Sequence, residues 1–316
     1  MRDPQILRPF LLFPQFKHRV WGWNSIRSWF EDAPDGVVGE AWFTAPDNRI
    51  ADGTEFRELL RSHPQFLGDA SDSKHPDLCP LLVKLLFTSS RLSVQVHPKD
   101  EYAELHHQCP GKTEAWYVID SEPGAAVALG LKHKLSPEQF RAAAENGEIE
   151  RHLDWRPVSP GDIFYVPAGT VHAIGAGLTI CEVQQNSDIT YRLYDYGRPR
   201  ELHLDHGCNV AELGAYSQNN TRKQISPGRD ILVECDCFTV EHWTASSGRF
   251  ELSSKLPYYL ILFVLRGTGT VAGAPFSKGQ AWFVPAGADP FAIEGSGEWL
   301  VAYRTHEPPP PCKLFQ

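Results

Sequence analysis

The segment Leu92-Ser-Val-Gln-Val-His-Pro98 has the alternating pattern of a β-strand and carries two polar side chains of metal-ligand type. Alternate side chains of a strand project to the same face. Gln95 and His97 therefore point one way, and Val94 and Val96 point the other way. One strand thus presents an amide and an imidazole to the same side of a sheet.

Two later segments supply further side chains of this kind. Gly111-Lys-Thr-Glu-Ala-Trp-Tyr117 carries a carboxylate at Glu114, and Val166-Pro-Ala-Gly-Thr-Val-His172 ends on a second imidazole. Strands of one barrel can bring all of these groups into a common interior. Two imidazoles, a carboxylate and an amide oxygen suit a tetrahedral or five-coordinate zinc site, whereas magnesium would not need the histidines. The predicted metal ligands are Gln95, His97, Glu114 and His172.

An internal repeat predicts two modules of related design. The paired motifs are Gly161-Asp-Ile-Phe-Tyr-Val-Pro-Ala-Gly169 with Gly279-Gln-Ala-Trp-Phe-Val-Pro-Ala-Gly287, and Trp116-Tyr-Val-Ile119 with Leu262-Phe-Val-Leu265. In this alignment Glu114 falls opposite Leu260, and His172 falls opposite Pro290. The second module therefore has the scaffold of the first without its metal ligands.

The overall pattern predicts a mostly β chain with helices in its N-terminal part. Helices are expected at residues 24–32, 54–62 and 99–107, and from a Ser136 cap to Gly147. We predict a metal-binding β-barrel domain at residues 1–212 and a smaller, metal-free barrel at residues 213–316.

Composition limits the class of protein. The formal charge of −9 without a dense basic stripe argues against a nucleic-acid partner. The apolar run at residues 81–87 is too short to span a membrane, and the N-terminus has no signal-peptide pattern. Seven scattered cysteines without a C-x-x-C pair favour reduced thiols and a cytoplasmic location.

These motifs resemble the short bacterial form of type I mannose-6-phosphate isomerase, a zinc enzyme built on cupin (jelly-roll) β-barrels. The likeness covers most of the chain. It includes Val20-Trp-Gly22, Gly39-Glu-Ala-Trp42, residues 80–84, 92–98, 111–118, 166–172 and 188–198, and Arg200-Glu-Leu-His203. One departure is Trp23, where the family commonly has a second glycine.

The resemblance implies one Zn²⁺ per chain, held by the four ligands that the strand pattern selects. It implies an aldose–ketose isomerase that interconverts mannose 6-phosphate and fructose 6-phosphate through a metal-stabilised enediolate, in a monomer or weak homo-oligomer. The implied catalytic residues are Arg192, Glu182 and Lys112, and the implied substrate-binding residues are Lys84, Ser93 and Arg192.

Two other functions remain open from the sequence. The chain could be a non-catalytic cupin that binds sugar phosphates. It could also be a cupin metal oxygenase, although a site of two histidines and one carboxylate would not call for Gln95 or phosphate-binding cations. Glu182 could be a structural carboxylate, and Arg192 could simply pair with Asp188 or Asp195.

Overall fold

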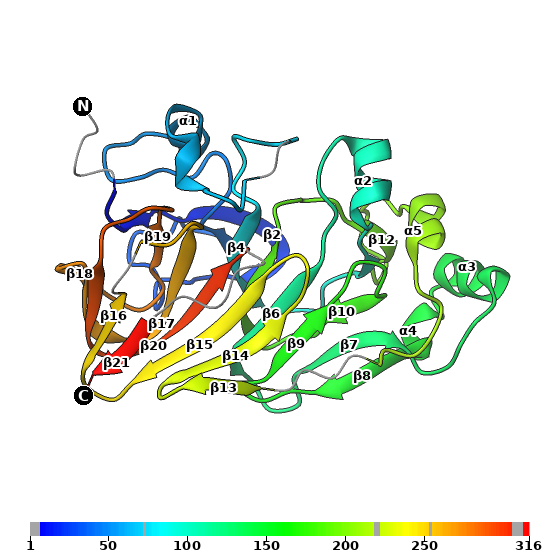
Figure 1. The fold of residues 1–316 in the computed structure, drawn as a ribbon. Coiled ribbons are helices and arrows are strands. Elements are labelled where there is room, and N and C mark those ends of the chain that lie inside the picture. Colours follow the sequence, from blue (N-terminus) through cyan, green and yellow to red (C-terminus); the bar gives the residue numbers. More distant parts are fainter. Residues whose placement is uncertain (1–6, 72–73, 218–221, 253–254, 305–311, 316) are drawn as a thin grey trace.

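A computed structural model shows a mostly β protein built from two modules (Figure 1). It describes all residues except 1–6, 72–73, 218–221, 253–254, 305–311 and 316. The prediction of a mostly β, cupin-like fold is confirmed.

The first module consists of two antiparallel sheets that face each other. In order across the six-stranded sheet, the strands are β2 (Gln15–Trp23), β3 (Val38–Trp42), β4 (Leu81–Thr88), β11 (Leu178–Gln185), β6 (Glu114–Ser121) and β9 (Ile163–Val166). In order across the five-stranded sheet, they are β12 (Tyr191–Tyr194), β5 (Val94–Val96), β10 (His172–Ile174), β7 (Ala126–Leu131) and β8 (Leu153–Pro157). A buried apolar cluster that includes Trp116 and Leu129 joins the facing sides of the two sheets.

The second module is a ten-stranded antiparallel sheet. Its main path is β1 (Phe10–Leu12), β19 (Ala281–Val284), β17 (Leu260–Val271), β20 (Phe291–Tyr303), β15 (Thr239–Ala245), β14 (Arg229–Glu234) and β13 (Lys223–Ser226). The strands off this path are β16 (Arg249–Leu252), β18 (Ala274–Phe276) and β21 (Cys312–Phe315).

Most of the helices decorate the first module, where α2, α3, α4 and α5 gather on one side of it (Figure 1). The helices are α1 (Phe56–Ser62), η1 (Pro64–Phe66), α2 (Asp100–His107), α3 (Pro137–Asn146), α4 (Ile149–His152) and α5 (Leu204–Val210). The start of α3 has the predicted capping box, because the Ser136 hydroxyl accepts from the Gln139 N–H and the Gln139 side chain accepts from the Ser136 N–H. Gly147 ends the helix in the left-handed region at φ 81°.

The helix predicted at residues 24–32 was wrong, because this segment forms turns. The N–H groups of Trp29 and Phe30 both donate to the carbonyl of Ile26, at 2.9 and 3.0 Å, but no regular helix continues from there. The apolar spacing serves tertiary packing instead. The ring of Trp29 contacts Phe87, and that of Phe30 contacts Phe16.

Strand β4 explains how a lysine can occupy an apolar run. All of its residues are buried, because the six-stranded sheet is covered on both faces. Val83 and Phe87 belong to the apolar cluster shared with the second module. Lys84 alternates with them and therefore faces the interior of the first barrel.

Short segments at the borders of the two modules pair with strands of the other module. Strand β1, near the N-terminus, pairs with β19 of the second sheet, with Leu11 opposite Trp282. Conversely, Ala215 forms an isolated bridge with Gly130 of the first module. The domain division at residues 212 and 213 stays a prediction.

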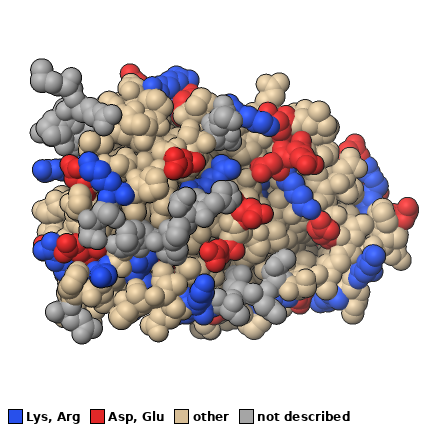
Figure 2. Space-filling view, viewed as in Figure 1, with Lys and Arg blue, Asp and Glu red and all other residues tan. Residues whose placement is uncertain are grey.

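The charged side chains of the protein are mixed in sign. On the face that Figure 2 shows, which is the view of Figure 1, acidic and basic residues are interspersed without an extended area of one sign. Among the described residues, no helix is long and apolar enough to cross a membrane.

Candidate active site

Three side chains of metal-ligand type converge inside the first barrel. His97, Glu114 and His172 are all buried, and one ligand atom from each lies within 4.8 Å of the others. His97 directly follows β5 and His172 begins β10, both in the five-stranded sheet, whereas Glu114 begins β6 in the facing sheet. The cluster therefore joins the two walls of the barrel.

Gln95, the fourth predicted ligand, lies beside this cluster. Its register partners are His172 on β10 and Arg192 on β12. Its Oε1 accepts a hydrogen bond of 3.4 Å from the Ser93 hydroxyl, and its side chain lines the cavity next to the cluster. A role for Gln95 as a metal ligand stays a prediction.

Main-chain carbonyl groups fix the orientation of both histidines. Nδ1 of His97 lies 2.7 Å from the carbonyl oxygen of Ile189, and Nδ1 of His172 lies 2.8 Å from that of Thr170. A carbonyl oxygen only accepts, so Nδ1 carries the hydrogen in each ring and Nε2 keeps its lone pair. Nε2 of His172 is buried without a hydrogen-bond partner. Imidazoles that bind metals are held in this way.

The surroundings keep both rings neutral. Burial lowers the pKa of His172 to about 4, and the ammonium group of Lys112 acts in the same direction. Burial also lowers the pKa of His97 well below its ordinary value, again with help from Lys112. Both Nε2 lone pairs are therefore available at neutral pH.

The donor atoms of the cluster fit zinc. Nζ of Lys112 lies 3.0 Å from Oε1 of Glu114 and 3.3 Å from Nε2 of His97, so these atoms already hold a positively charged group. Two neutral ring nitrogens and a carboxylate oxygen are typical zinc ligands. A buried nitrogen without a partner is costly, and a metal ion would remove that cost at His172.

A buried ion pair lies next to the cluster. Nζ of Lys84 and Oε2 of Glu182 are 2.9 Å apart, and their side chains are only 3% and 5% exposed. The two residues are register partners on β4 and β11. Nε1 of Trp116 donates to Oε1 of Glu182 at 2.9 Å and to Oε2 of Glu114 at 3.1 Å. One indole thus connects the ion pair to the cluster.

Lys84 stays charged in this setting. Burial by itself lowers the pKa of the ammonium group, but the carboxylates of Glu182, Glu40 and Asp188 raise it by more. The result is a pKa above its usual range. A permanent positive charge therefore lies within the barrel.

A cavity of about 410 Å³ opens beside these groups. Of the predicted site residues it is lined by Lys84, Ser93, Gln95, Lys112, Glu182 and Arg192. Two residues connect the cluster to the cavity. Lys112 contacts His97 and Glu114, and Trp116 contacts Glu114 and His172. The structure thus brings all nine predicted residues to one region of the first barrel, although their roles stay predictions.

Arg192 is not a simple ion-pair partner in the described part of the chain. Its guanidinium donates to the carbonyl of Glu201 at 2.8 Å, while Asp195 pairs with Arg198 and Arg200 instead. Burial lowers the pKa of Arg192, and the nearby Arg200 adds to this effect. Nε of Arg192 is buried without a hydrogen-bond partner, so the side chain keeps a donor for a ligand.

Sequence reasoning missed several residues of the cavity. Six further lining residues carry polar groups: His18, Arg19, Glu40, Asp188, Thr190 and Arg200. A signal for some of them was present, since Arg19 precedes Val20-Trp-Gly22, and Glu40 lies within Gly39-Glu-Ala-Trp42. These motifs contribute to the family resemblance, but the sequence alone does not indicate a role for Arg19 or Glu40.

The second module lacks a comparable centre in the described ranges. Leu260, opposite Glu114 in the repeat, is fully buried in an apolar cluster. The buried polar groups of this module include an ion pair, with NH2 of Arg229 2.7 Å from Oε2 of Glu241. Nε1 of Trp243 also donates to that carboxylate. The metal-free character of the second module stays a prediction.

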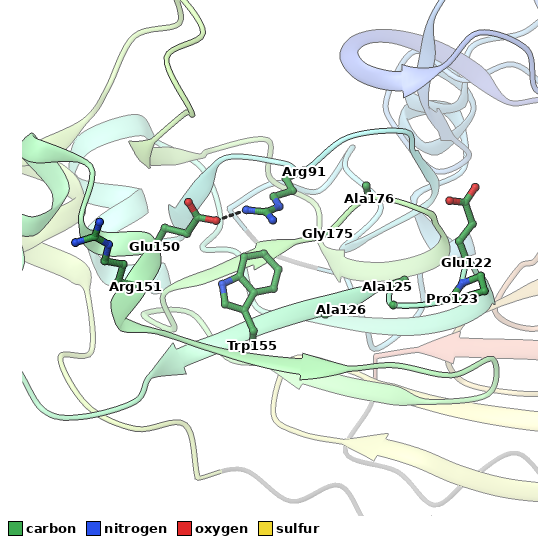
Figure 3. Close-up of a pocket in the computed structure, with 11 residues that line it drawn as sticks. Arg91, Glu122, Pro123, Ala125, Ala126, Glu150, Arg151, Trp155, Gly175 and Ala176 are labelled. Atoms are coloured by element: carbon green, nitrogen blue, oxygen red, sulfur yellow. Dashed lines mark hydrogen bonds and ion pairs between the residues drawn. The ribbon is translucent and has the colours of Figure 1, made fainter.

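A larger cavity, of about 630 Å³, contains none of the predicted residues (Figure 3). It is lined by Trp155 and by the ion pair of Arg91 with Glu150, together with small residues such as Ala126 and Gly175. Leu92 and Ile174, the sequence neighbours of Arg91 and Gly175, line the cavity of about 410 Å³ instead. Adjacent residues of the same two segments therefore line the two cavities.

The fold and the cluster together define a cupin-type β-barrel protein with a buried histidine–carboxylate cluster that could hold a metal ion. A family model for the catalytic domain of type I phosphomannose isomerase matches residues 10–137, and one for the mannose-6-phosphate isomerase cupin domain matches residues 229–304. Mannose-6-phosphate isomerase ManA of Bacillus subtilis (strain 168) is 37% identical over 93% of this chain and 98% of the relative. The chain belongs to the type I phosphomannose isomerase family.

Other relatives and solved structures agree. Mannose-6-phosphate isomerase of Streptococcus mutans is 36% identical over 83% of this chain and 86% of the relative. The crystal structure of mannose 6-phosphate isomerase from Bacillus subtilis aligns with a TM-score of 0.86 and 31% identity, covering 93% of this chain and 99% of that one. A phosphomannose isomerase from Salmonella typhimurium shares the fold, with a TM-score of 0.77 at 14% identity over 94% of this chain and 100% of that one.

Proposed function

We propose that this protein is a zinc-dependent isomerase that interconverts mannose 6-phosphate and fructose 6-phosphate. The relatives named above are called mannose-6-phosphate isomerases. The observation that carries the proposal is the buried group of His97, Glu114 and His172 beside a cavity rich in cationic side chains. One end of that arrangement suits a metal ion and the other suits a phosphate.

The isomerisation moves a proton between two adjacent carbon atoms. Removal of the proton by a base would leave an enediolate intermediate with negative charge on oxygen, before the proton is returned to the neighbouring carbon. When bound by His97, Glu114, His172 and Gln95, a zinc ion would supply a Lewis acid that stabilises this charge. The proposal takes one zinc ion per chain. The hydrogen bonds from Nδ1 of each histidine to a main-chain carbonyl support zinc binding by these residues, because they orient the rings and leave Nε2 available.

Glu182 and Lys112 are the candidates for proton transfer. Both line the cavity, and each is held by an opposite charge. Glu182 accepts from Trp116 on one oxygen and from Lys84 on the other, so its carboxylate is fixed in position. A fixed acid–base group loses little entropy when the substrate binds.

Arg192, Lys84 and Ser93 would bind the substrate. Arg192 has a buried guanidinium nitrogen without a partner, which supports a role in binding oxygen atoms of the sugar phosphate. Lys84 supplies a buried positive charge, and Ser93 supplies a hydroxyl group beside Gln95. Arg192 would also stabilise negative charge as it develops on the substrate.

The test is a coupled isomerase assay on the purified protein before and after chelation. We expect turnover of mannose 6-phosphate, its loss with the chelator and its recovery with added zinc. Metal analysis should give about one zinc per chain. A metal-loaded protein that binds the sugar phosphate without turnover would instead support the non-catalytic alternative. The proposal includes a cytoplasmic location, which seven free cysteines support.

A further inference from the structure

We propose that Arg19 anchors the phosphate group of the substrate, and that the motif Gly39-Glu-Ala-Trp42 holds Arg19 in place for this task. The inference rests on the proposed function for the identity of the substrate. Neither Arg19 nor this motif takes part in the metal centre or in the proton transfer proposed above. Their contacts nevertheless converge on the same cavity.

The position of Arg19 suits a phosphate group at the end of the cavity that lies away from the cluster of His97, Glu114 and His172. Glu40, Lys84, Glu182 and Glu114 lie on four neighbouring strands, β3, β4, β11 and β6, and their register places them on one face. Neighbouring strands are about 4.8 Å apart, so the backbones of Glu40 and Glu114 lie roughly 14 Å apart across the sheet. They are also offset along the strands, because Glu40 is opposite Leu86 whereas Glu114 is opposite Gln184, the partner of Leu82. The cavity extends between Arg19 and the cluster, because Arg19 lines it together with Gln95 and Lys112, which lie beside the cluster.

A chain of contacts holds Arg19 at this end. NH2 of Arg19 lies 2.8 Å from Oε2 of Glu40. The same carboxylate oxygen accepts a hydrogen bond of 2.9 Å from Nε1 of Trp42. Because the indole keeps hold of Glu40, the carboxylate stays in place even when the guanidinium turns toward another anion. Glu40 is buried, so the pair is poorly screened by solvent.

Gly39 makes room for the stem of Arg19. A Cβ atom at residue 39 would lie 2.5 Å from Cβ and 2.7 Å from Cγ of Arg19. Any larger residue would therefore displace the arginine. Each chemically distinctive residue of the motif thus acts on Arg19: Gly39 by its size, Glu40 by its charge and Trp42 through Glu40.

Arg19 also keeps free hydrogen-bonding capacity. Arg200, by comparison, uses Nε and NH2 on the two oxygens of Asp195, at 2.6 and 2.7 Å. Arg19 gives one nitrogen to Glu40 and makes a long contact of 3.4 Å from NH1 to the carbonyl of His18. Its side chain is 30% exposed at the cavity, so the remaining donors of its planar fork can reach a phosphate.

The experiment compares Arg19→Gln with Lys17→Gln, a matched control. Lys17 lies on the same strand, and its ammonium group is 4.8 Å from the ring of the same Trp42, but it does not line the cavity. In Arg19→Gln we expect KM for mannose 6-phosphate to rise about 10- to 100-fold, because a charged hydrogen bond to the phosphate is lost. The value of kcat should change little. Lys17→Gln should leave both constants unchanged.

Inorganic phosphate provides a second readout that does not depend on turnover. Its dissociation constant, measured by calorimetry, should rise in Arg19→Gln by a similar factor, and Arg19→Lys should recover part of the affinity. Gly39→Ala should weaken phosphate binding too, because it displaces the stem of Arg19. If the wild-type protein binds phosphate but does not turn over mannose 6-phosphate, the proposed function fails while the role of Arg19 is still decided. Unchanged phosphate affinity in Arg19→Gln, or a loss of kcat without a change in KM, would overturn the inference.

Discussion

Substituting Glu182 by glutamine tests whether the charge of this buried carboxylate stabilises the fold. The side chains of Glu182 and Lys84 are almost fully buried, and Nζ and Oε2 are 2.9 Å apart. Glutamine keeps an oxygen that can accept from Nε1 of Trp116, so mainly the charge is removed. Lys84 would then be a buried cation without the partner that contributes most to its raised pKa.

The magnitude follows from two limits. Breaking a buried ion pair by removing one partner usually costs about 3–5 kcal/mol. The cost is also bounded, because Lys84 can lose its proton. Bringing a lysine from its ordinary pKa to neutrality at pH 7 costs about 4.6 kcal/mol. We therefore expect Glu182→Gln to lower the free energy of unfolding by about 3–5 kcal/mol.

Urea denaturation at pH 7, followed by tryptophan fluorescence and circular dichroism, measures this change. The control is Glu212→Gln, which removes one partner of the pair between Lys99 and Glu212, whose side chains are both 68% exposed. That pair should contribute less than about 1 kcal/mol. Adding Lys84→Met to Glu182→Gln should recover much of the lost stability. The reasoning is refuted if Glu182→Gln costs no more than Glu212→Gln, or if the double variant is no more stable than the single one.

Three further predictions concern the proposed zinc ligands and Arg192. His172→Ala should lose bound zinc and turnover together, as measured by metal analysis and the coupled assay; full activity without metal would contradict a zinc role. Arg192→Ala should keep its zinc but lose most of its turnover, and a normal rate would remove Arg192 from the site. In metal-free protein, His172 should lower the free energy of unfolding by about 2.6 kcal/mol between pH 6.5 and pH 4, because the unfolded chain protonates it while the folded state, with a pKa of about 4, is only half protonated at pH 4. His97, whose pKa is also lowered, adds to this loss. Urea denaturation across this range measures the loss, and His172→Gln should show a flatter profile; identical profiles would contradict the assignment.

Much of the cluster of His97, Glu114 and His172 could be predicted from the sequence, because the alternation of side chains along a strand is a local pattern. The alternation in residues 92–98 sets which way His97 points, and a strand has only two faces. The repeat likewise indicated that Leu260 replaces the carboxylate in the second module, and the structure buries Leu260 in apolar packing. The turns at residues 24–32 could not be predicted, since Trp29 and Phe30 are spaced for partners that lie far away in the sequence.

The amino-acid sequence by itself determined the strand character of the chain, the faces of its polar side chains and the types of donor atom they offer, because these follow from period-two geometry and side-chain chemistry. Only the tertiary structure decided which charges meet. Lys84 faces Glu182, and Arg19 faces Glu40, because β4 pairs with β11 and because Gly39 lets the stem of Arg19 pass. Such pairings depend on strand order and register, which bring together residues that are distant in the sequence.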